Sequence, residues 1–517
     1  MKSDSLIRST TLFSIATFIS RILGLVRDAC ISNFLPLSVQ SIFWIGFRIP
    51  STFRQLFAEG ALSAAFIPLL TRVREREGEE KAREVSFAVF NLLSMTVTVV
   101  VALCIVFAPY FVPLILDFPG QDPAKEAQAV QATRIMFPFL IFIAVSAWSM
   151  GVLNTYRTFF IPALASAFFN VSVITGALIS WRYQGQFNSI SVLGASVIIG
   201  GFLQYAIQIW PCQRIGYFPP RAISPFHPAV RVFLGNLAPS IFGLAIYQFN
   251  ALVTQTYFAS KYGDVGINSI TYAHRLIQFP LGLVGVALAT ASFPRIAQYL
   301  EQGRREDAAK TLTDVLKYLL LLMLPAAAGL IVMGQDIIGL IFNRIEFLSN
   351  NLLTPTYELL VFYCSGLFFY AAFGVMVRTF QAHHDFRTPV ITGTIGVAAN
   401  IALCAYFSRF LPLWSMALAS SLASMINVTL LLILIRRNMT TLRYLPLIAF
   451  GAKTLTASVG MGAVCWLFCA YFPPAEAKFL LYFVRTVIGI TLGVISFVAL
   501  GRLLFYDELL VLIRKKR

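Results

Sequence analysis

The chain has 517 residues, of which 58% are hydrophobic and only 12% are charged, and its mean hydropathy is +0.76. This composition excludes a soluble globular protein and indicates a polytopic membrane protein. The formal net charge of +17 does not imply nucleic-acid binding, because the basic residues gather in the short polar gaps between long apolar runs.

The apolar runs define the predicted elements. Each of about fourteen runs has the length of roughly 20 residues that is needed to cross the hydrocarbon core of a bilayer. The first run is too long for a cleavable signal peptide, and no small-residue cleavage site follows it, so we expect it to stay as the first helix. In chain order the predicted helices are 10–34, 39–71, 84–108, 130–155, 158–181, 190–210, 230–258, 266–298, 313–334, 354–381, 388–408, 411–435, 446–471 and 480–505.

Alternate polar gaps differ in their content of Lys and Arg. One set carries basic clusters, and the other set carries about one basic residue per gap. Because basic loops stay in the cytoplasm, this pattern places both termini inside the cell. The basic gaps are 72–83, 214–231, 304–317, 436–443 and 514–517.

One basic gap has a helical pattern of its own. Between the predicted helices 266–298 and 313–334, charged residues alternate with Leu300, Ala308 and Leu312 at helical spacing. This pattern predicts a helix on the cytoplasmic membrane surface, and a solvated loop is the alternative.

An internal repeat appears when the chain is compared with itself at a shift of about 227 positions. Three places then coincide. Arg48 meets Arg275, residues 66–68 meet 293–294, and the turn at 157–162 meets 386–389.

The repeat predicts the domain organisation. Six helices per repeat is an even number, so both repeats enter the membrane in the same sense and are related by an axis along the membrane normal. We therefore expect an all-α polytopic membrane protein with two six-helix lobes, 1–225 and 226–440, around a central cavity, followed by two further helices in 441–517. This is the architecture of transporters in which one lobe rocks against the other.

Arginines stand inside apolar runs, where a lone arginine costs roughly 2.5 to 3.5 kcal/mol at the bilayer centre. Such residues need water, a partner or a ligand. Arginine keeps its charge and binds phosphate oxygens through two parallel hydrogen bonds, so the cluster predicts a cavity for an anion, clamped from both lobes. The primary candidates are Arg21, Arg27, Arg54 and Arg275.

Secondary candidates complete the predicted site, and some have structural alternatives. These residues are Ser20, Asp28, Arg48, Glu59, His274 and Arg378. Arg27 could instead be an arginine paired with Asp28. Glu59 could simply pair with an arginine, and Arg378 could extend to the membrane surface.

The helix that carries Arg48 and Arg54 contains Pro50, which removes a backbone donor and frees a carbonyl. The two arginines are six positions apart, so on a straight helix they point in different directions. A break at Pro50 would turn them together, and the alternative is that one is functional and the other structural.

Motifs of other function classes are missing from the sequence. There is no phosphate-binding G-x-x-x-x-G-K-[ST] loop and no H-E-x-x-H motif, so we expect no enzyme activity. His383 and His384 stand in a short turn without further ligands, and we expect neither a metal nor a cofactor. The seven cysteines fall mostly in apolar runs and predict no disulfide framework.

Several segments resemble the MurJ (MviN) family of lipid II flippases, and the likeness runs through essentially the whole chain. The segments are SRILGLVRD at 20–28, FAEGALS at 57–63 with Phe66 and Pro68, FP at 279–280 with GVAL at 285–288, and DFRTP at 385–389. Multidrug extruders and polysaccharide-lipid flippases of the same superfamily share the two-lobed fold, but we do not expect them to match the arginine segments.

The resemblance implies a bacterial inner-membrane protein. Its implied activity moves lipid II, the undecaprenyl-diphosphate-linked peptidoglycan precursor, from the cytoplasmic to the outer leaflet by alternating access. The cavity arginines of the family match Arg21, Arg27, Arg54 and Arg275, and the helices of 441–517 match those that form a groove for the lipid tail. The expected partners are lipid II, membrane lipids and peptidoglycan synthesis proteins, and the expected state is a monomer.

The sequence departs from the family pattern at several acids. Ser41, His274 and Gln278 replace acidic residues, so we expect a more positive cavity than is usual in the family. Cys404, four residues after Asn400, replaces an acid of sodium-binding relatives. Our hypothesis is that the membrane potential, worth about 2.3 kcal/mol per charge per 100 mV, resets the arginine-rich lobe.

Other functions remain open from the residues. A transporter of this type could export another undecaprenyl-diphosphate-linked glycan or an amphipathic drug. A non-catalytic membrane partner of cell-wall synthases is a further alternative. Mid-membrane acids that recognise cations would favour a drug exporter, and the second half of the sequence has none at mid-membrane depth, since Asp314 and Glu358 stand near the ends of their predicted helices.

Overall fold

The structure is a computed structural model of the whole chain. It describes the backbone except at residues 1, 57–60, 121, 219, 221–227, 343–344, 438, 440–443, 473–478 and 515–517. Among the residues with a described backbone, side chains are described for all except 2–14, 61–64, 229, 236–244, 345, 479 and 505–514.

Regular structure in the described residues is helical, apart from one isolated bridge between Gln184 and Phe187. The all-α prediction is therefore confirmed. The helices are α1 (Lys2–Phe34), α2 (Leu37–Arg54), α3 (Ala61–Glu77), α4 (Glu79–Leu114), α5 (Pro123–Met136), α6 (Phe139–Thr155), α7 (Phe160–Arg182), α8 (Ser189–Arg214), α9 (Pro228–Leu252), η2 (Val253–Phe258), α10 (Gly263–Pro280), η3 (Leu281–Gly285), α11 (Val286–Glu301), α12 (Arg305–Ile341), α13 (Ile345–Ser349), α14 (Leu353–Ser365), α15 (Leu367–Ala382), α16 (Arg387–Phe407), α17 (Ser415–Ile435), α18 (Tyr444–Tyr471) and α19 (Phe479–Arg514), where η marks a π-helix.

Ten helical segments of the described chain are long and apolar enough to cross a membrane, and the bent pair α14 and α15 makes an eleventh. The three other predicted spans coincide with α1, with α2 and α3, and with α9 and η2. The chain is thus a multi-pass membrane protein, and the count of fourteen spans stays a prediction.

The predicted repeat has a counterpart in the helix boundaries. Helices α4 and α12 begin 226 and end 227 positions apart, and α7 and α16 begin 227 positions apart. Both repeats also contain a divided helix at the same place, α5 with α6 and α14 with α15. The remaining pairs are α1 with α9 and η2, α2 with α10, α3 with α11, and α8 with α17.

The turn before α7 and the turn before α16 have the same backbone. Arg157 and His384, which lie 227 positions apart, both have a left-handed backbone, with φ of 60° and 58°. The amide of Thr158 donates to the carbonyl of Leu153 over 2.9 Å, and the amide of Asp385 donates to that of Phe380 over 3.0 Å. A left-handed conformation is uncommon for residues other than glycine, so its recurrence at one repeat distance supports the internal repeat.

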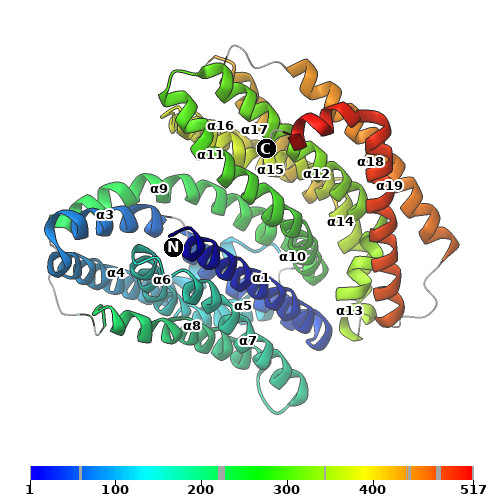
Figure 1. Ribbon diagram of the computed structural model, residues 1–517. Coiled ribbons are helices and arrows are strands. Elements are labelled where there is room, and N and C mark those ends of the chain that lie inside the picture. The colour runs from blue at the N-terminus through cyan, green and yellow to red at the C-terminus, as the bar shows by residue number, and fades with distance from the viewer. Residues whose placement is uncertain are drawn as a thin grey trace. The chain divides into compact units, whose positions relative to one another are not determined.

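The chain forms two compact units, Met1–Asn268 and Ser269–Arg517, which are called unit 1 and unit 2 below. In unit 1, α1 lies along α7, and α7 packs on α8 (Figure 1). Helix α2 packs on α5. Gly46 of α2 permits the last contact, because an added Cβ would lie 2.7 Å from the Cβ of Ala132. The predicted lobe limits of 225 and 440 stay a prediction, and unit 1 also contains α9 and the start of α10.

In unit 2, α12 packs on α18 and α19, and α14 and α15 pack on α17 (Figure 1). The sequence predicts one span at 354–381, but α14 and α15 meet at an angle of 47°. The break lies at Gly366, where an added Cβ would be 2.6 Å from Oγ of Ser421. The Ser421 hydroxyl donates to the carbonyl of Phe362 over 2.8 Å, and so satisfies a backbone group close to the break.

The predicted surface helix or loop at 298–317 is wrong. Helix α11 continues to Glu301, a short turn with Gly303 at φ 72° follows, and α12 begins at Arg305. Ala308 and Leu312 are fully buried, so their helical spacing reflects packing against neighbouring helices and not contact with a membrane surface.

Candidate functional site

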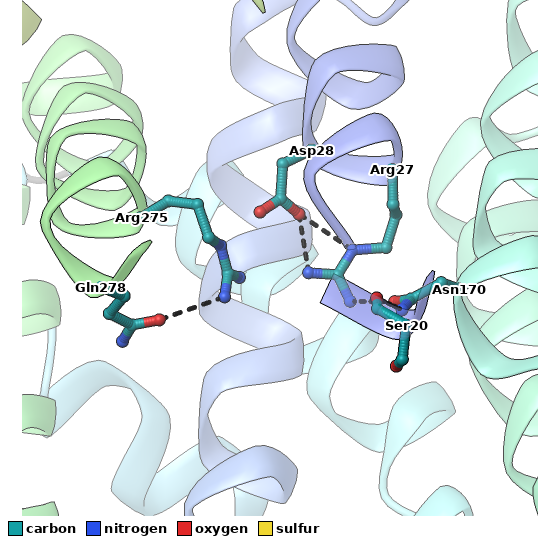
Figure 2. Close-up of polar contacts among 6 residues, drawn as sticks. All are labelled: Ser20, Arg27, Asp28, Asn170, Arg275 and Gln278. Atoms are coloured by element: carbon teal, nitrogen blue, oxygen red, sulfur yellow. Dashed lines mark hydrogen bonds and ion pairs between the residues drawn. The ribbon is translucent and has the colours of Figure 1, made fainter. Parts of the chain in front are cut away.

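Arg27 is buried in unit 1, with only 7% of its surface exposed. Its Nε and Nη2 donate to one oxygen of the Asp28 carboxylate over 2.9 and 2.6 Å, and its Nη1 donates to Oδ1 of Asn170 over 3.1 Å (Figure 2). The amide nitrogen of Asn170 in turn donates to the carbonyl of Ser20 over 3.0 Å. This network ties α1 to α7.

The surroundings of Arg27 make an unpaired charge costly at this position. Its guanidinium lies 6.0 Å from the centre of the Phe169 ring, which belongs to a cluster with Phe47 and Phe139. Such a low-dielectric environment strengthens a hydrogen-bonded pair and makes an isolated charge costly. Arg27 is therefore paired with Asp28, as the structural alternative expects, and its role toward a substrate stays a prediction.

Arg21 lies on the same helix but differs from Arg27 in exposure. It is exposed, and within the described residues no ion pair to it is recorded. Arg54, the last residue of α2, is half-buried. Glu59 lies outside the described residues, so the expected pairing of this acid is a prediction only.

Arg48 has a structural partner in unit 1. Its Nη1 donates to the carbonyl of Gln255 in the π-helix η2. Seven positions away on each segment, the side-chain amide nitrogen of Gln248 donates to Oε1 of Gln55. Arg48 therefore holds α2 against the end of the long α9–η2 segment.

Ser41 contacts a carboxylate, that of Asp264, which was not predicted from the sequence. The Ser41 hydroxyl donates to Oδ1 of Asp264, at the start of α10, and Nζ of Lys125 lies 2.7 Å from Oδ2 of the same residue. Asn268 adds a hydrogen bond of 3.1 Å to the carbonyl of Leu37. An acid is therefore present at Ser41 despite the substitution, and Lys125 neutralises it.

In unit 2, α10 presents three polar side chains in a row. Nη1 of Arg275 donates to Oε1 of Gln278 over 3.3 Å (Figure 2), and Nε2 of Gln278 lies 3.2 Å from Nδ1 of His274. The His274 ring also meets the ring of Tyr363 on α14, with 5.9 Å between the centroids. Arg275 and His274 are half-buried, and Gln278 is exposed.

The other predicted residues have few described contacts that indicate a function. Arg378 is half-buried, one turn before the end of α15. His383 and His384 lie in the turn before α16, and no group of three metal-ligating side chains is present in the described part of the chain. Sγ of Cys404 lies 3.7 Å from Oδ1 of Asn400, where both residues are buried.

Sequence reasoning missed the partners of Arg27, Arg48 and Ser41. Asn170, Gln255 and Asp264 have no motif that distinguishes them from other polar residues in or beside apolar runs. The one available signal was their polarity within or next to an apolar run, since buried polar groups need hydrogen-bonding partners.

The sequence matches a known protein family. A family model described as lipid II flippase MurJ matches residues 36–501. A probable lipid II flippase MurJ of Rhizobium meliloti (strain 1021) is 32% identical over 480 residues, which cover 90% of this chain and 88% of the relative. The lipid II flippase MurJ of Burkholderia cenocepacia is 30% identical over 414 residues, 79% of each chain.

Solved structures agree with this assignment. A lipid II flippase MurJ in an inward closed conformation is 26% identical, with a TM-score of 0.79 over 96% of this chain and 100% of that chain. An inward-facing multidrug MATE family transporter is 12% identical, with a TM-score of 0.70 over 82% of this chain and 95% of that chain, and so shares the fold. The chain belongs to the lipid II flippase MurJ family.

Proposed function

We propose that this protein translocates lipid II from the cytoplasmic to the outer leaflet of the bacterial inner membrane by alternating access. The observation that carries the proposal is the match of the family model to residues 36–501, which covers most of the chain. The relatives from Rhizobium meliloti and Burkholderia cenocepacia, both named as flippases of this family, support it.

The proposed binding groups are arginines. Arg21, Arg54 and Arg275 are exposed or half-buried in helices of an apolar chain, where a charge needs water, a partner or a ligand. A diphosphate offers two adjacent anionic groups, which suit the planar donor fork of arginine. In this proposal Arg27 supports the site from its buried pair with Asp28, and can also contact the substrate.

Transport and not catalysis is the proposed role of these groups. The helices provide a hydrophobic body, and the arginines provide the charge that compensates the diphosphate while it crosses the membrane. Both termini lie in the cytoplasm in this proposal, and the protein works as a monomer with lipid II as its substrate.

Growth rescue tests the proposal. The wild-type chain is expressed in a bacterium whose own lipid II flippase is depleted, beside Arg21→Ala and Arg275→Ala and the control Arg182→Ala. Arg182 is an exposed arginine at the end of α7, so its loss should preserve rescue. We expect rescue by the wild type and the control and failure of the two site variants at equal membrane levels.

Other outcomes would decide against parts of the proposal. If a correctly inserted wild type does not rescue growth, the substrate is another lipid-linked glycan or an amphipathic molecule. If both site variants rescue as well as the wild type, Arg21 and Arg275 do not bind the substrate. Arg27→Ala is less informative, because it removes both hydrogen bonds to the fully buried Asp28 and so perturbs folding.

A further inference from the structure

The turn between η2 and α10 is tied to segments that come much earlier in the chain. Asp264, at the start of α10, forms an ion pair of 2.7 Å with Lys125 of α5 and accepts a hydrogen bond from the Ser41 hydroxyl of α2. The side chain of Asn268 donates to the carbonyl of Leu37 over 3.1 Å. These contacts fasten the turn to the starts of α2 and α5.

A second set of contacts joins the same turn to the segment between α4 and α5. The backbone amide of Asp117 donates to Oγ of Ser260 over 2.7 Å. Nζ of Lys261 lies 3.4 Å from Oδ2 of Asp117. These contacts, together with those of Asp264 and Asn268, are called the latch below.

The latch joins the two sequence repeats. Helices α2 and α10 have equivalent places in the repeats, so the turn belongs to the second repeat and its partners in α2 and α5 belong to the first. All of the latch residues lie in unit 1, and α10 continues past Asn268 into unit 2. The latch therefore holds the chain at the point where it passes from one unit to the next.

The latch residues stand in or beside polar gaps of one kind. The gaps are 35–38, 109–129 and 259–265, and each contains at most one Lys or Arg. Because basic gaps stay in the cytoplasm, the positive-inside rule predicts the outer face of the membrane for these three gaps.

The ion pairs of the latch can separate at low cost. The side chains of Asp264 and Lys125 are each 18% exposed. Those of Lys261 and Asp117 are 32% and 47% exposed. Exposed ion pairs contribute little to stability, whereas α2 and α5 of the first repeat meet closely at Gly46. Polar and partly exposed contacts suit an interface that opens and closes.

The backbone beside the latch is irregular. The π-helix η2 ends at Phe258, and Gly263 has a left-handed backbone with φ of 66°. Single turns of π-helix often lie at functional sites, and glycine adopts a left-handed backbone without steric cost. These two places allow the turn to change direction without breaking a regular α-helix.

We propose that the latch is an outer gate, which holds the two repeats together at the outer face and opens when the substrate leaves toward the outer leaflet. Ser41 and Asn268 are fully buried in the closed latch, and water reaches them when it opens. The role of the latch in transport rests on the proposed function, but its opening does not.

Thiol labelling measures the opening without lipid II. Ser41→Cys replaces a fully buried hydroxyl with a thiol, which a water-soluble maleimide reaches only in the open latch. The protein is held in nanodiscs, where both membrane faces are accessible, and mass spectrometry follows the peptide that contains residue 41. Adding Lys125→Met removes the charge and keeps an unbranched side chain. We expect about fivefold faster labelling, the effect of losing a partly exposed ion pair.

Two controls separate the latch from general loosening. Lys125→Met/Asp264→Asn should label no faster at residue 41 than the faster of the single variants, because both changes remove the same ion pair. Ser149→Cys, buried in α6, should label at the same rate with and without Lys125→Met. An unchanged rate at residue 41 in Lys125→Met, or an equal acceleration at residue 149, would overturn the latch.

A disulfide tests whether the latch must open during transport. Ser41→Cys/Asp264→Cys places two thiols where the hydroxyl and the carboxylate are in contact. The control Ala289→Cys/Gly374→Cys joins α11 to α15 within the second repeat. An added Cβ at Gly374 lies 3.9 Å from the Cβ of Ala289, a separation that a disulfide can span.

The two disulfide variants should behave differently. We expect the fully oxidised latch variant to expose no lipid II at the outer face and to recover after reduction, while the control transports in both states. Transport by the fully oxidised latch variant would overturn the outer gate. The expected labelling together with no transport by the wild type would support the opening of the latch and refute the proposed function.

Discussion

A buried ion pair fastens the C-terminal helices of unit 2 to α12. Nε of Arg485 on α19 lies 3.1 Å from Oδ2 of Asp336 on α12, and the two side chains are 13% and 6% exposed. Nη2 of Arg485 also donates to the carbonyl of Cys469 at the end of α18, over 3.3 Å. Removing Asp336 should therefore loosen three helices at once.

The cost of Asp336→Asn follows from the burial of Arg485. Breaking a buried pair by the loss of one partner costs about 3 to 5 kcal/mol, and an uncompensated arginine in a membrane helix costs about 2.5 to 3.5 kcal/mol. We expect a loss of about 3 kcal/mol in the free energy of unfolding. Arg485→Gln should cost only about 1 to 2 kcal/mol, because a lone carboxylate can take up a proton while arginine cannot lose one.

The double variant Asp336→Asn/Arg485→Gln should be about as stable as Arg485→Gln, since the charge has then been removed from both sides. The free energy of unfolding is measured in bicelles for the four members of this cycle. The exposed pair Arg304–Asp307, with a separation of 2.8 Å, serves as the control, and Asp307→Asn should cost less than about 1 kcal/mol. The reasoning would be refuted if Asp336→Asn cost no more than Asp307→Asn.

Three further changes have defined outcomes. Asp264→Asn should lower the free energy of unfolding of unit 1 by about 1 kcal/mol, because Lys125 loses its partner, and a thermal melt that matches the wild type would contradict this. Burial raises the pKa of Asp385, but hydrogen bonds from the Thr388 hydroxyl and from backbone amides outweigh burial and lower the pKa overall. Asp385→Ala should therefore lower the free energy of unfolding by about 1 kcal/mol above about pH 3.9. This difference between the variant and the wild type should vanish as the pH falls through the lowered pKa. Gly366→Ala should cost about 1 to 3 kcal/mol through its clash with Ser421, and unchanged stability would show that α14 and α15 tolerate a wider separation from α17.

Helices and their repeat could be predicted from the sequence because both depend on local pattern. Long apolar runs mark membrane helices, and a shift of about 227 positions aligns them. Their ends were predicted less well. The run at 313–334 is part of α12, which extends from Arg305 to Ile341, and Asp336 therefore lies inside a helix that was thought to end before it. Hydropathy detects the apolar part of a helix and misses the polar helical residues that extend it at either end.

The partners of Arg27, Arg48 and Ser41 in other helices could not be predicted, because they come from distant parts of the chain. Arg27 meets Asn170, Arg48 meets the carbonyl of Gln255, and Ser41 meets Asp264. The Arg27–Asp28 pair is local, and it was left open as an alternative. The local sequence pattern does not show which helices pack against each other.

The central claim is that arginines of this chain carry a diphosphate lipid across the membrane. Its most direct measurement is the amount of lipid II that becomes accessible to a membrane-impermeant hydrolase on the outer face of cells depleted of their own flippase. We predict that the wild-type chain restores this accessible lipid II and that Arg275→Ala, at the same membrane level, does not. Restoration by Arg275→Ala to the wild-type amount, or no restoration by the correctly inserted wild type, would contradict the account.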